Sequence, residues 1–338
     1  MSKIKTTLLG LALGCVASSA VLAQSTTTLR VATWAPNSNP QNAVVWPTWA
    51  KWVEEATEGR VDVEIINYTG HPKSIFSGVE DGIYDVGFSV NAYLSGRFLL
   101  TSIAEIPGET IDAASASSAL WRVQQEYFKP ANEYDGLTLL GMFVHAPGQM
   151  QTTFPVNRLE DLKGKKIRLG GGMVNELAKR LDVTPVIAPA SKSYEMLQQG
   201  IVEGTFLPTG EQKSYRLAEV TSDLTLFPNG LYTTVFSIVM NPYTFDQLSE
   251  QDQKAIMSVS GEKLSRMAGK AWQEDATKGI AYAQENGVNV VTLDKNDPRV
   301  IEMGKLTKGI DQVWLDSVAD RQVDAKGALA AFRKYIKE

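Results

Sequence analysis

Cysteine and histidine are almost absent from this chain of 338 residues. The sequence has one cysteine, Cys15, and two histidines, His71 and His145. Because Cys15 lies in a segment that we expect to be removed, the mature protein would have no disulfide, no cysteine nucleophile and no cysteine-ligated metal. The histidines lie in different segments and form no HExxH or HxH motif. We therefore expect neither a metal nor a cofactor.

Signatures of common catalytic and nucleotide-binding sites are missing as well. The sequence contains no GxSxG nucleophile elbow and no GxxxxGK[ST] phosphate loop, and its acidic residues are too scattered to nominate a carboxylate pair. A glycine run at 170–172 follows a predicted strand and opens a predicted helix. Its N–H groups could cradle an anion, or the run could simply form a tight turn. We expect a binding protein rather than an enzyme.

The charge balance is mildly acidic. Lys and Arg number 33 against 38 Asp and Glu, which gives a formal net charge of −5. Nucleic acid is therefore not expected as a partner, because a phosphate backbone requires a basic face. With 43% apolar and 21% charged residues the composition is that of a globular protein. The length suggests two domains.

The first 23 residues have the layout of a secretory signal peptide. Lys3 and Lys5 precede an apolar stretch over 8–22, and Ala23 provides a small residue for cleavage. A membrane-spanning helix is the weaker alternative, because the run falls short of about 20 apolar residues. A lipid anchor on Cys15 is weaker too, because Ala stands where a lipobox has Leu. We expect export to a bacterial periplasm.

Strand-like and helix-like segments alternate along the rest of the chain, which predicts an α/β fold with parallel strands and helical crossovers. Expected strands cover 28–33, 61–66, 85–88, 137–144, 149–154, 165–169, 184–187, 204–206, 235–240 and 288–293. Expected helices cover 42–58, 117–129, 192–199 and 298–323, with one more that ends near 181. The segments divide into a first lobe (24–145 with 235–260), a second lobe (146–234 with part of 287–320) and C-terminal helices (298–338).

A long helix is expected over 249–286. Ser249 to Asp252 resembles a capping box, no proline follows before Asn286, and Gly287 supplies a stop. A bend is expected at Gly261 or Gly269. Two α/β lobes that are connected more than once leave a cleft between them, which is where small ligands bind.

Arg168 is the first candidate for such a ligand site. It lies in the predicted strand 165–169, with one residue between it and the glycine run. A guanidinium at the end of an α/β strand can make two parallel bonds to a carboxylate, which lysine cannot do. The alternative is a surface arginine paired with a neighbour, and spacing alone leaves both open.

At this point the sequence resembles a known family. The run Leu159-Glu-Asp-Leu-Lys-Gly-Lys-Lys-Ile-Arg168 is similar to the signature strand of TRAP-type (tripartite ATP-independent periplasmic) solute-binding proteins, the DctP type. Further similar motifs are Ala32-Thr-Trp-Ala-Pro36, Gly82-Ile-Tyr-Asp-Val-Gly87, Pro185-Val-Ile-Ala-Pro189, Ser193-Tyr-Glu-Met-Leu-Gln-Gln-Gly-Ile-Val-Glu-Gly204 and Met240-Asn-Pro242. Together the motifs cover essentially all of 28–320.

The resemblance implies a two-lobed periplasmic binding protein fold of the type II kind, with a long helix across both lobes. It implies capture of an organic anion by lobe closure and delivery to membrane permease subunits that run on an ion gradient. Arg168 would pair with the ligand carboxylate. The binding protein itself is expected to be a monomer.

Departures from the family pattern suggest the kind of ligand. Leu207 stands where many acid binders have a polar residue. A less polar pocket favours a carboxylate with an apolar or aromatic body over a sugar acid. The expected flat walls are Trp34, Tyr93, Phe206 and Tyr232, and the weaker candidates for polar contacts are Asn91, Gln149, Thr209 and Glu211, with Gly170 beside Arg168. The alternatives are a binding protein of an ATP-driven importer, a sensor component and, least supported, a periplasmic enzyme.

Overall fold

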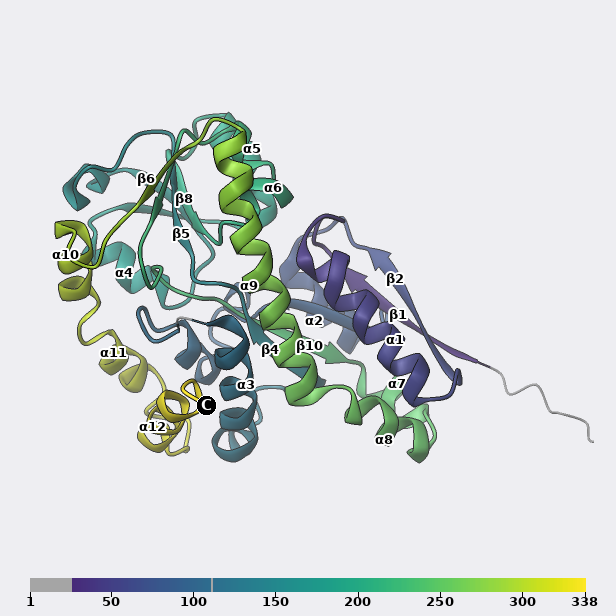
Figure 1. Ribbon diagram of the computed structural model, residues 1–338. Coiled ribbons are helices and arrows are strands. Elements are labelled where there is room, and N and C mark those ends of the chain that lie inside the picture. Colours follow the sequence, from purple (N-terminus) through teal and green to yellow (C-terminus); the bar gives the residue numbers. More distant parts are fainter. Residues whose placement is uncertain (1–25, 111) are drawn as a thin grey trace, which may run out of the picture.

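The computed structural model describes residues 26–110 and 112–338, which form two lobes, each built on one β-sheet (Figure 1). The first sheet has the strand order β2-β1-β3-β10-β4 and the second the order β11-β9-β5-β8-β6-β7. The expected α/β class and two-lobed architecture are confirmed. The expected signal peptide, with Cys15 and Ala23, lies outside the described residues.

The first sheet combines parallel and antiparallel strands. It contains β1 (Thr27–Thr33), β2 (Val61–Asn67), β3 (Val86–Val90), β4 (Thr138–Val144) and β10 (Val235–Met240). Strand β1 runs parallel to β2 and β3, whereas β10 runs antiparallel to β3 and β4. The expectation of parallel strands is therefore wrong for β10, because this strand arrives directly from the other lobe and not through a helix on the same sheet. The carboxyl ends of β1 and β3 and the start of β10 consequently lie at the same end of the sheet.

The second sheet is mixed in the same way. It contains β5 (Gln149–Thr152), β6 (Lys166–Leu169), β7 (Thr184–Ile187), β8 (Gly204–Leu207), β9 (Asp223–Leu226) and β11 (Asn289–Thr292). Strand β5 runs antiparallel to β8 and β9, whereas β6 runs parallel to β7 and β8. Strand β9 was not predicted. The helices of the second lobe include α4 (Val174–Arg180), α5 (Ser193–Gln198) and α6 (Glu211–Ser214).

Helices of the first lobe pack against its sheet: α1 (Trp46–Ala56) on β2, α2 (Ile75–Glu80) on β3 and α3 (Ala113–Val123) on β4. Helix α7 (Pro242–Gln247) follows β10, and α8 (Glu250–Ser258) contacts α1. Helix α1 has Pro47 in its first turn, as expected, and buries Trp46 and Trp49 in the core of this lobe. The expected helix over 42–58 is a π-turn over Gln41–Val45 that continues into α1.

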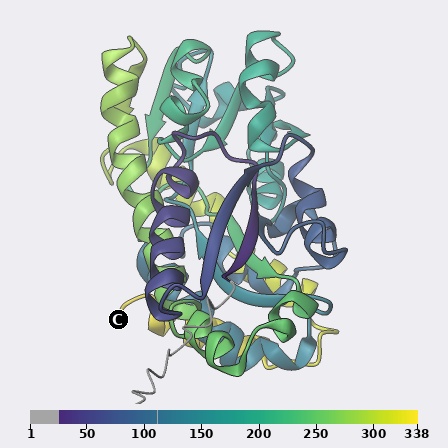
Figure 2. The same cartoon turned by 90° about the vertical axis from the view of Figure 1, so that its right-hand side faces the viewer.

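One long helix, α9 (Gly261–Glu285), packs against both lobes (Figures 1 and 2). It contacts α3 and β4 in the first lobe, and α6 and β11 in the second. The helical stretch expected over 249–286 consists of two helices, α8 and α9, which are separated at residues 259–260. Gly261 has a φ of +61°, which a residue with a side chain adopts at a cost, so the expected bend falls there and not at Gly269.

The chain passes between the lobes in the segments 145–148 and 227–234 as well as along α9. Its C-terminal helices are α10 (Pro298–Thr307), α11 (Ile310–Ser317) and α12 (Ala325–Tyr335). Helix α10 contacts α4 in the second lobe and α12 contacts α3 in the first. The expected helical run over 298–323 is interrupted at Gly309, whose φ is +80°.

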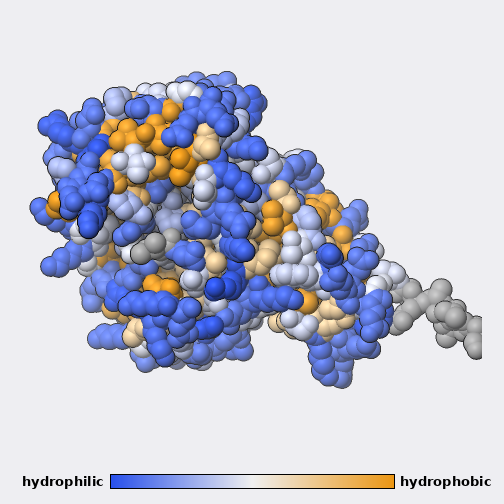
Figure 3. Space-filling view, in the orientation of Figure 1, coloured by the Kyte–Doolittle hydropathy of each residue, from blue (hydrophilic) through white to orange (hydrophobic). Residues whose placement is uncertain are grey.

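The surface is mainly hydrophilic on the face shown in Figure 3, with apolar areas over the second lobe and at the outer side of the first. Among the residues that the structure describes, no helix combines the length and the apolar character that a membrane span requires.

Candidate ligand-binding cavity

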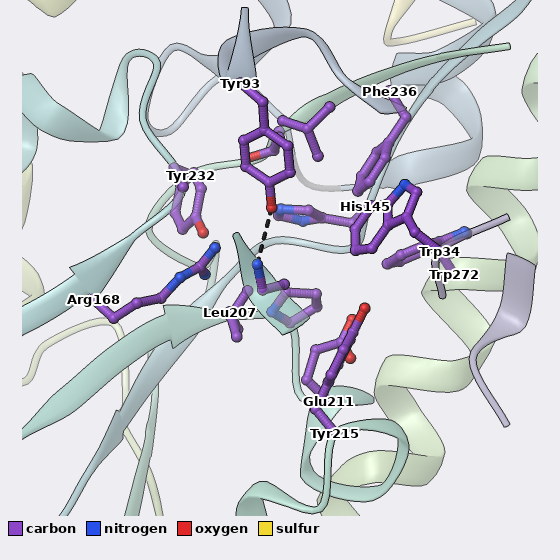
Figure 4. A pocket seen from close by; sticks show the side chains of 15 residues that line it. Trp34, Tyr93, His145, Arg168, Leu207, Glu211, Tyr215, Tyr232, Phe236 and Trp272 are labelled. Atoms are coloured by element: carbon purple, nitrogen blue, oxygen red, sulfur yellow. Dashed lines mark hydrogen bonds between the residues drawn. The ribbon is translucent and has the colours of Figure 1, made fainter. Parts of the chain in front are cut away.

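A cavity lies where the two lobes meet (Figure 4). Ends of β1, β3 and β10 line it from the first lobe, and β6, β8 and α6 from the second. The lining residues are Trp34, Val90, Tyr93, His145, Arg168, Gly170, Ala190, Leu207, Pro208, Glu211, Tyr215, Tyr232, Thr234, Phe236 and Trp272.

Arg168 is the permanent cation of this cavity. Its side chain is buried, with 1% of the residue exposed. Nε and Nη2 donate to the carbonyl oxygen of Ala188 at 2.9 and 2.5 Å, but Nη1 has no hydrogen-bond partner among the described residues. A buried cation that is not paired with a carboxylate is unusual, because no opposite charge offsets the free energy lost when the cation leaves water. Such a group is suited to an incoming anion.

Glu211 is the carboxyl group of the cavity, and it faces the interior from the start of α6. It is buried, with 3% exposed, and its Oε2 accepts a hydrogen bond from the Ser214 hydroxyl. Burial, with a smaller contribution from the nearby Asp275 carboxyl, raises the pKa of Glu211 to about 8, while Ser214 and Arg168 oppose the rise. Glu211 is therefore mainly protonated at neutral pH and leaves the positive charge of Arg168 uncompensated.

Aromatic side chains form most of the remaining wall. The rings of Trp34 and Phe88 are stacked with centroids 5.4 Å apart, and the Trp34 indole N–H donates to the Phe88 carbonyl. Phe236 and Trp272 lie 4.9 Å apart between their centroids. These contacts hold the rings in place, so the cavity presents flat apolar surfaces before a ligand enters.

His145 adds a neutral polar group to this wall. Its Nδ1 lies 2.6 Å from the Ala146 carbonyl oxygen. Burial lowers the pKa of His145 to about 4, so the imidazole is uncharged at neutral pH. The carbonyl can only accept, which assigns the ring proton to Nδ1 and leaves Nε2 as an acceptor.

Hydrogen bonds beside the cavity join the two lobes. The Ala190 N–H of the second lobe donates to the Tyr93 hydroxyl of the first at 3.0 Å. Glu105, which ends a 3₁₀ turn of the first lobe, accepts from the N–H groups of Met173 at 3.2 Å and Val235 at 3.0 Å. Met173 precedes α4 in the second lobe. Burial raises the pKa of Glu105 to about 7, opposed by these two N–H groups.

The structure brings seven of the eleven predicted site residues together around the cavity. They are Trp34, Tyr93, Arg168, Gly170, Leu207, Glu211 and Tyr232. Six of them lie at the end of a strand or within four residues after it, and Tyr232 lies three residues before β10.

The other four predicted residues lie away from the cavity. Phe206 precedes Leu207 on β8, and neighbours on a strand face opposite sides, so Phe206 is buried within the second lobe. The side-chain amide of Gln149 donates to the Phe227 carbonyl and accepts from the Phe227 N–H. Asn91 donates to the Thr101 and Tyr134 hydroxyls, and Thr209 donates to the Ala276 carbonyl of α9. The sequence alone did not show these local partners.

Several lining residues were missed by the sequence analysis. Phe236 and Trp272 come from β10 and α9, which are remote from the other motifs and reach the cavity only through the tertiary fold. Tyr215 could have been found, because it follows Glu211 by four residues and so lies on the same helical face.

Two lobes that enclose a pocket with one unpaired cation define a solute-binding protein. The family described as bacterial extracellular solute-binding protein, family 7 (DctP), matches residues 31–303. The chain belongs to this family, and the resemblance to TRAP-type solute-binding proteins is confirmed.

Relatives of known structure or name support this assignment. The outer membrane transporter protein TsaT of Comamonas testosteroni is 30% identical over 314 residues, which is 92% of each chain. A TRAP periplasmic solute-binding protein of Bordetella bronchiseptica with bound (R)- and (S)-mandelate is 34% identical, with a TM-score of 0.88 over 92% of this chain and 99% of the other. A marine metagenome TRAP protein specific for aromatic acids, in complex with 3-hydroxybenzoate, is 26% identical, with a TM-score of 0.85 over 93% and 98%.

Proposed function

We propose that this protein captures an aromatic monocarboxylate in the bacterial periplasm and delivers it to the membrane permease of a TRAP transporter. The observation that carries the proposal is the buried Arg168, whose Nη1 lacks a partner among the described residues in a cavity with aromatic walls. A ligand carboxylate would accept a hydrogen bond from the free Nη1–H of Arg168, and an aromatic body would pack against Trp34 and Phe236.

Two further observations support an aromatic acid. The relatives that bind mandelate and 3-hydroxybenzoate share the fold over nearly their whole length. In addition, Leu207 lines the cavity at a position where acid binders of this type often have a polar residue. A sugar acid would leave several hydroxyls without partners against such walls, which is costly.

Calorimetric titration of the purified protein tests the proposal. We expect mandelate, benzoate or 3-hydroxybenzoate to bind tightly, and glucuronate and succinate weakly or not at all. Native mass spectrometry of the protein as purified should find an acid of the same class, recovered unchanged because the protein only binds it. Tight binding of a sugar acid or a dicarboxylate, without binding of any aromatic acid, would reject the proposal.

Arg168→Ala should weaken binding of the aromatic acid by about 2–5 kcal/mol, because the desolvated carboxylate would lose its charged partner. Arg266→Ala is the matched control, since Arg266 is exposed on α9 and is not among the residues that line the cavity. Unchanged affinity of the Arg168 variant would remove this residue from the ligand site.

A further inference from the structure

We infer that the cavity recognises a hydroxyl group on its ligand through Glu211 and Tyr215, in addition to the carboxylate at Arg168. The preferred ligands would then be hydroxylated aromatic monocarboxylates. This inference rests on the proposed function and narrows its ligand class.

The two polar ends of the cavity are separate. Figure 4 shows Arg168 on one side, and Glu211 and Tyr215 lying next to each other on another, with Leu207 between the two groups. The Arg168 charge influences Glu211 only through space, and no salt bridge joins them in the described part of the chain. A ligand can therefore contact Arg168 with one end and the Glu211–Tyr215 pair with another part.

Both members of the pair have hydrogen-bonding capacity to spare. The Ser214 hydroxyl occupies Oε2 of Glu211, but no described residue bonds to Oε1. The Tyr215 hydroxyl likewise has no bond to any residue in 26–110 or 112–338, although Tyr215 is buried. The other two tyrosines of the wall differ, because the Tyr93 hydroxyl accepts from Ala190 and the Tyr232 hydroxyl donates to Phe206. Polar atoms of a cavity wall that have no protein partner are available to bond to a ligand.

The chemistry of the pair favours a hydroxyl over a second carboxylate. Glu211 is mainly a neutral acid at pH 7, and no described residue bonds to its Oε1, so this oxygen is available to a ligand. A ligand hydroxyl can donate or accept, so it can bond to Oε1 whichever oxygen of Glu211 carries the proton, and it can also bond to the Tyr215 hydroxyl. A second carboxylate would bring a second negative charge, whereas Arg168 is the one permanent cation among the lining residues. Burying an unpaired charge is expensive.

Matched pairs of acids test the inference by calorimetry. The pairs are 3-hydroxybenzoate with benzoate, 4-hydroxyphenylacetate with phenylacetate, and mandelate with phenylacetate. We expect the hydroxylated member to bind at least tenfold more tightly in at least one pair, since a site with buried polar groups rejects the analogue that leaves them unpaired. In the Glu211→Leu variant, the Kd values of the two members of that pair should differ by less than threefold. In the Tyr215→Phe variant, the ratio of the two Kd values should fall in part.

Further variants separate this inference from the proposed function. Glu211→Gln keeps a neutral donor and should preserve most of the ratio. Arg168→Ala should weaken both members of a pair alike and leave the ratio unchanged. Glu250→Leu on the exposed start of α8 is the control for the loss of a carboxyl, and thermal melting checks that each variant is folded.

Two results would overturn the inference. If aromatic acids bind but no pair differs by tenfold, or if the ratio survives Glu211→Leu in a folded protein, hydroxyl recognition by this pair is wrong while the proposed function stands. If no aromatic acid binds at all, both fail together.

Discussion

At the scale of single residues, the charges of the cavity wall are arranged to suit an anion, at a cost in stability. Arg168 is buried without a carboxylate partner, and Glu211, the acid nearest to its charge within the wall, is held largely in its neutral form. Had Glu211 been ionised and paired with Arg168, the cavity would be neutral and closed to an anion. An incoming carboxylate therefore supplies the charge compensation that the fold itself withholds.

The affinity for the aromatic acid should depend on pH through Glu211. Its pKa is raised to about 8 by burial, so it is neutral below this pH and ionised above it. The groups that face it are Arg168 from β6, Asp275 from α9, Tyr93 and Tyr215. Because an anion binds better beside a neutral acid, affinity should fall as pH rises above about 8, by at most about tenfold per unit.

Titrations from pH 6 to 9.5 check this dependence, with Glu211→Gln as the comparison. The variant cannot ionise at this position, so its affinity should not show the fall above pH 8. Glu105, whose pKa is raised to about 7 outside the cavity, is present in both proteins and cancels in the comparison. The same decline in wild type and variant would contradict the assignment to Glu211.

At this scale, sequence reasoning succeeded where the position of a residue follows from its place on a strand. Arg168, Tyr93 and Leu207 come at or near strand ends and reach the cavity. Phe206 and Leu207 were both nominated, because the phase of a four-residue strand is not visible in a largely apolar run, and only Leu207 lines the cavity. Asn91 lies outside the cavity wall and bonds to Tyr134, which is distant in sequence.

At the scale of elements, α9 holds the two lobes together through close backbone contacts at two glycines. A Cβ at Gly269 would lie 2.3 Å from the Ala113 carbonyl oxygen of α3, in the first lobe. A Cβ at Gly279 would lie 2.0 Å from the carbonyl oxygen of Thr209, next to α6 in the second. The helix thus contacts each lobe at a place where a side chain does not fit.

Gly269→Ala and Gly279→Ala should each destabilise the protein, by about 1–3 kcal/mol, because backbone atoms must shift to admit the methyl group. Gly279→Ala should also weaken ligand binding, since the displaced Thr209 lies two residues before Glu211. Gly304→Ala is the control: Gly304 is exposed within α10 with open space around it, and alanine there should stabilise the helix by about 0.5–1 kcal/mol. Thermal and urea unfolding measure these effects, and equal stabilities of all three variants would contradict them.

The order of elements was largely predictable, whereas their pairing was not. Hydrophobic periodicity located nearly all strands and the long helical region, because local burial patterns encode them. The antiparallel direction of β5 and β10 depends on how the chain crosses between lobes, which local pattern does not reveal. Strand β9 (Asp223–Leu226) was missed, although other strands of the same length were located.

At the scale of the whole molecule, the long-range field does not assist ligand capture. The formal net charge of −5 opposes the approach of an anion, so attraction must come from the local charge of Arg168 within the cavity. The lobes enclose this charge on all sides, and a ligand that touches both of them stabilises the arrangement in which they meet.

Hydrogen exchange can report this arrangement at two defined amides. The N–H groups of Ala190 and Met173 belong to the second lobe, but they donate to Tyr93 and Glu105 of the first. Both bonds break if the lobes separate. The Ala188 N–H is a matched control, because it donates to Leu169 within the second lobe at 3.1 Å and does not depend on the other lobe.

Addition of the aromatic acid should therefore slow exchange at Ala190 and Met173 far more than at Ala188. Ligand at 100 times its Kd stabilises the bound form by about 2.7 kcal/mol, which corresponds to about 100-fold slower exchange if opening requires ligand release. Arg168→Ala should abolish this protection at the same concentration. Uniform slowing at all three amides would instead mean that the ligand stabilises the second lobe alone, and that closure of one lobe on the other is not the event that retains it.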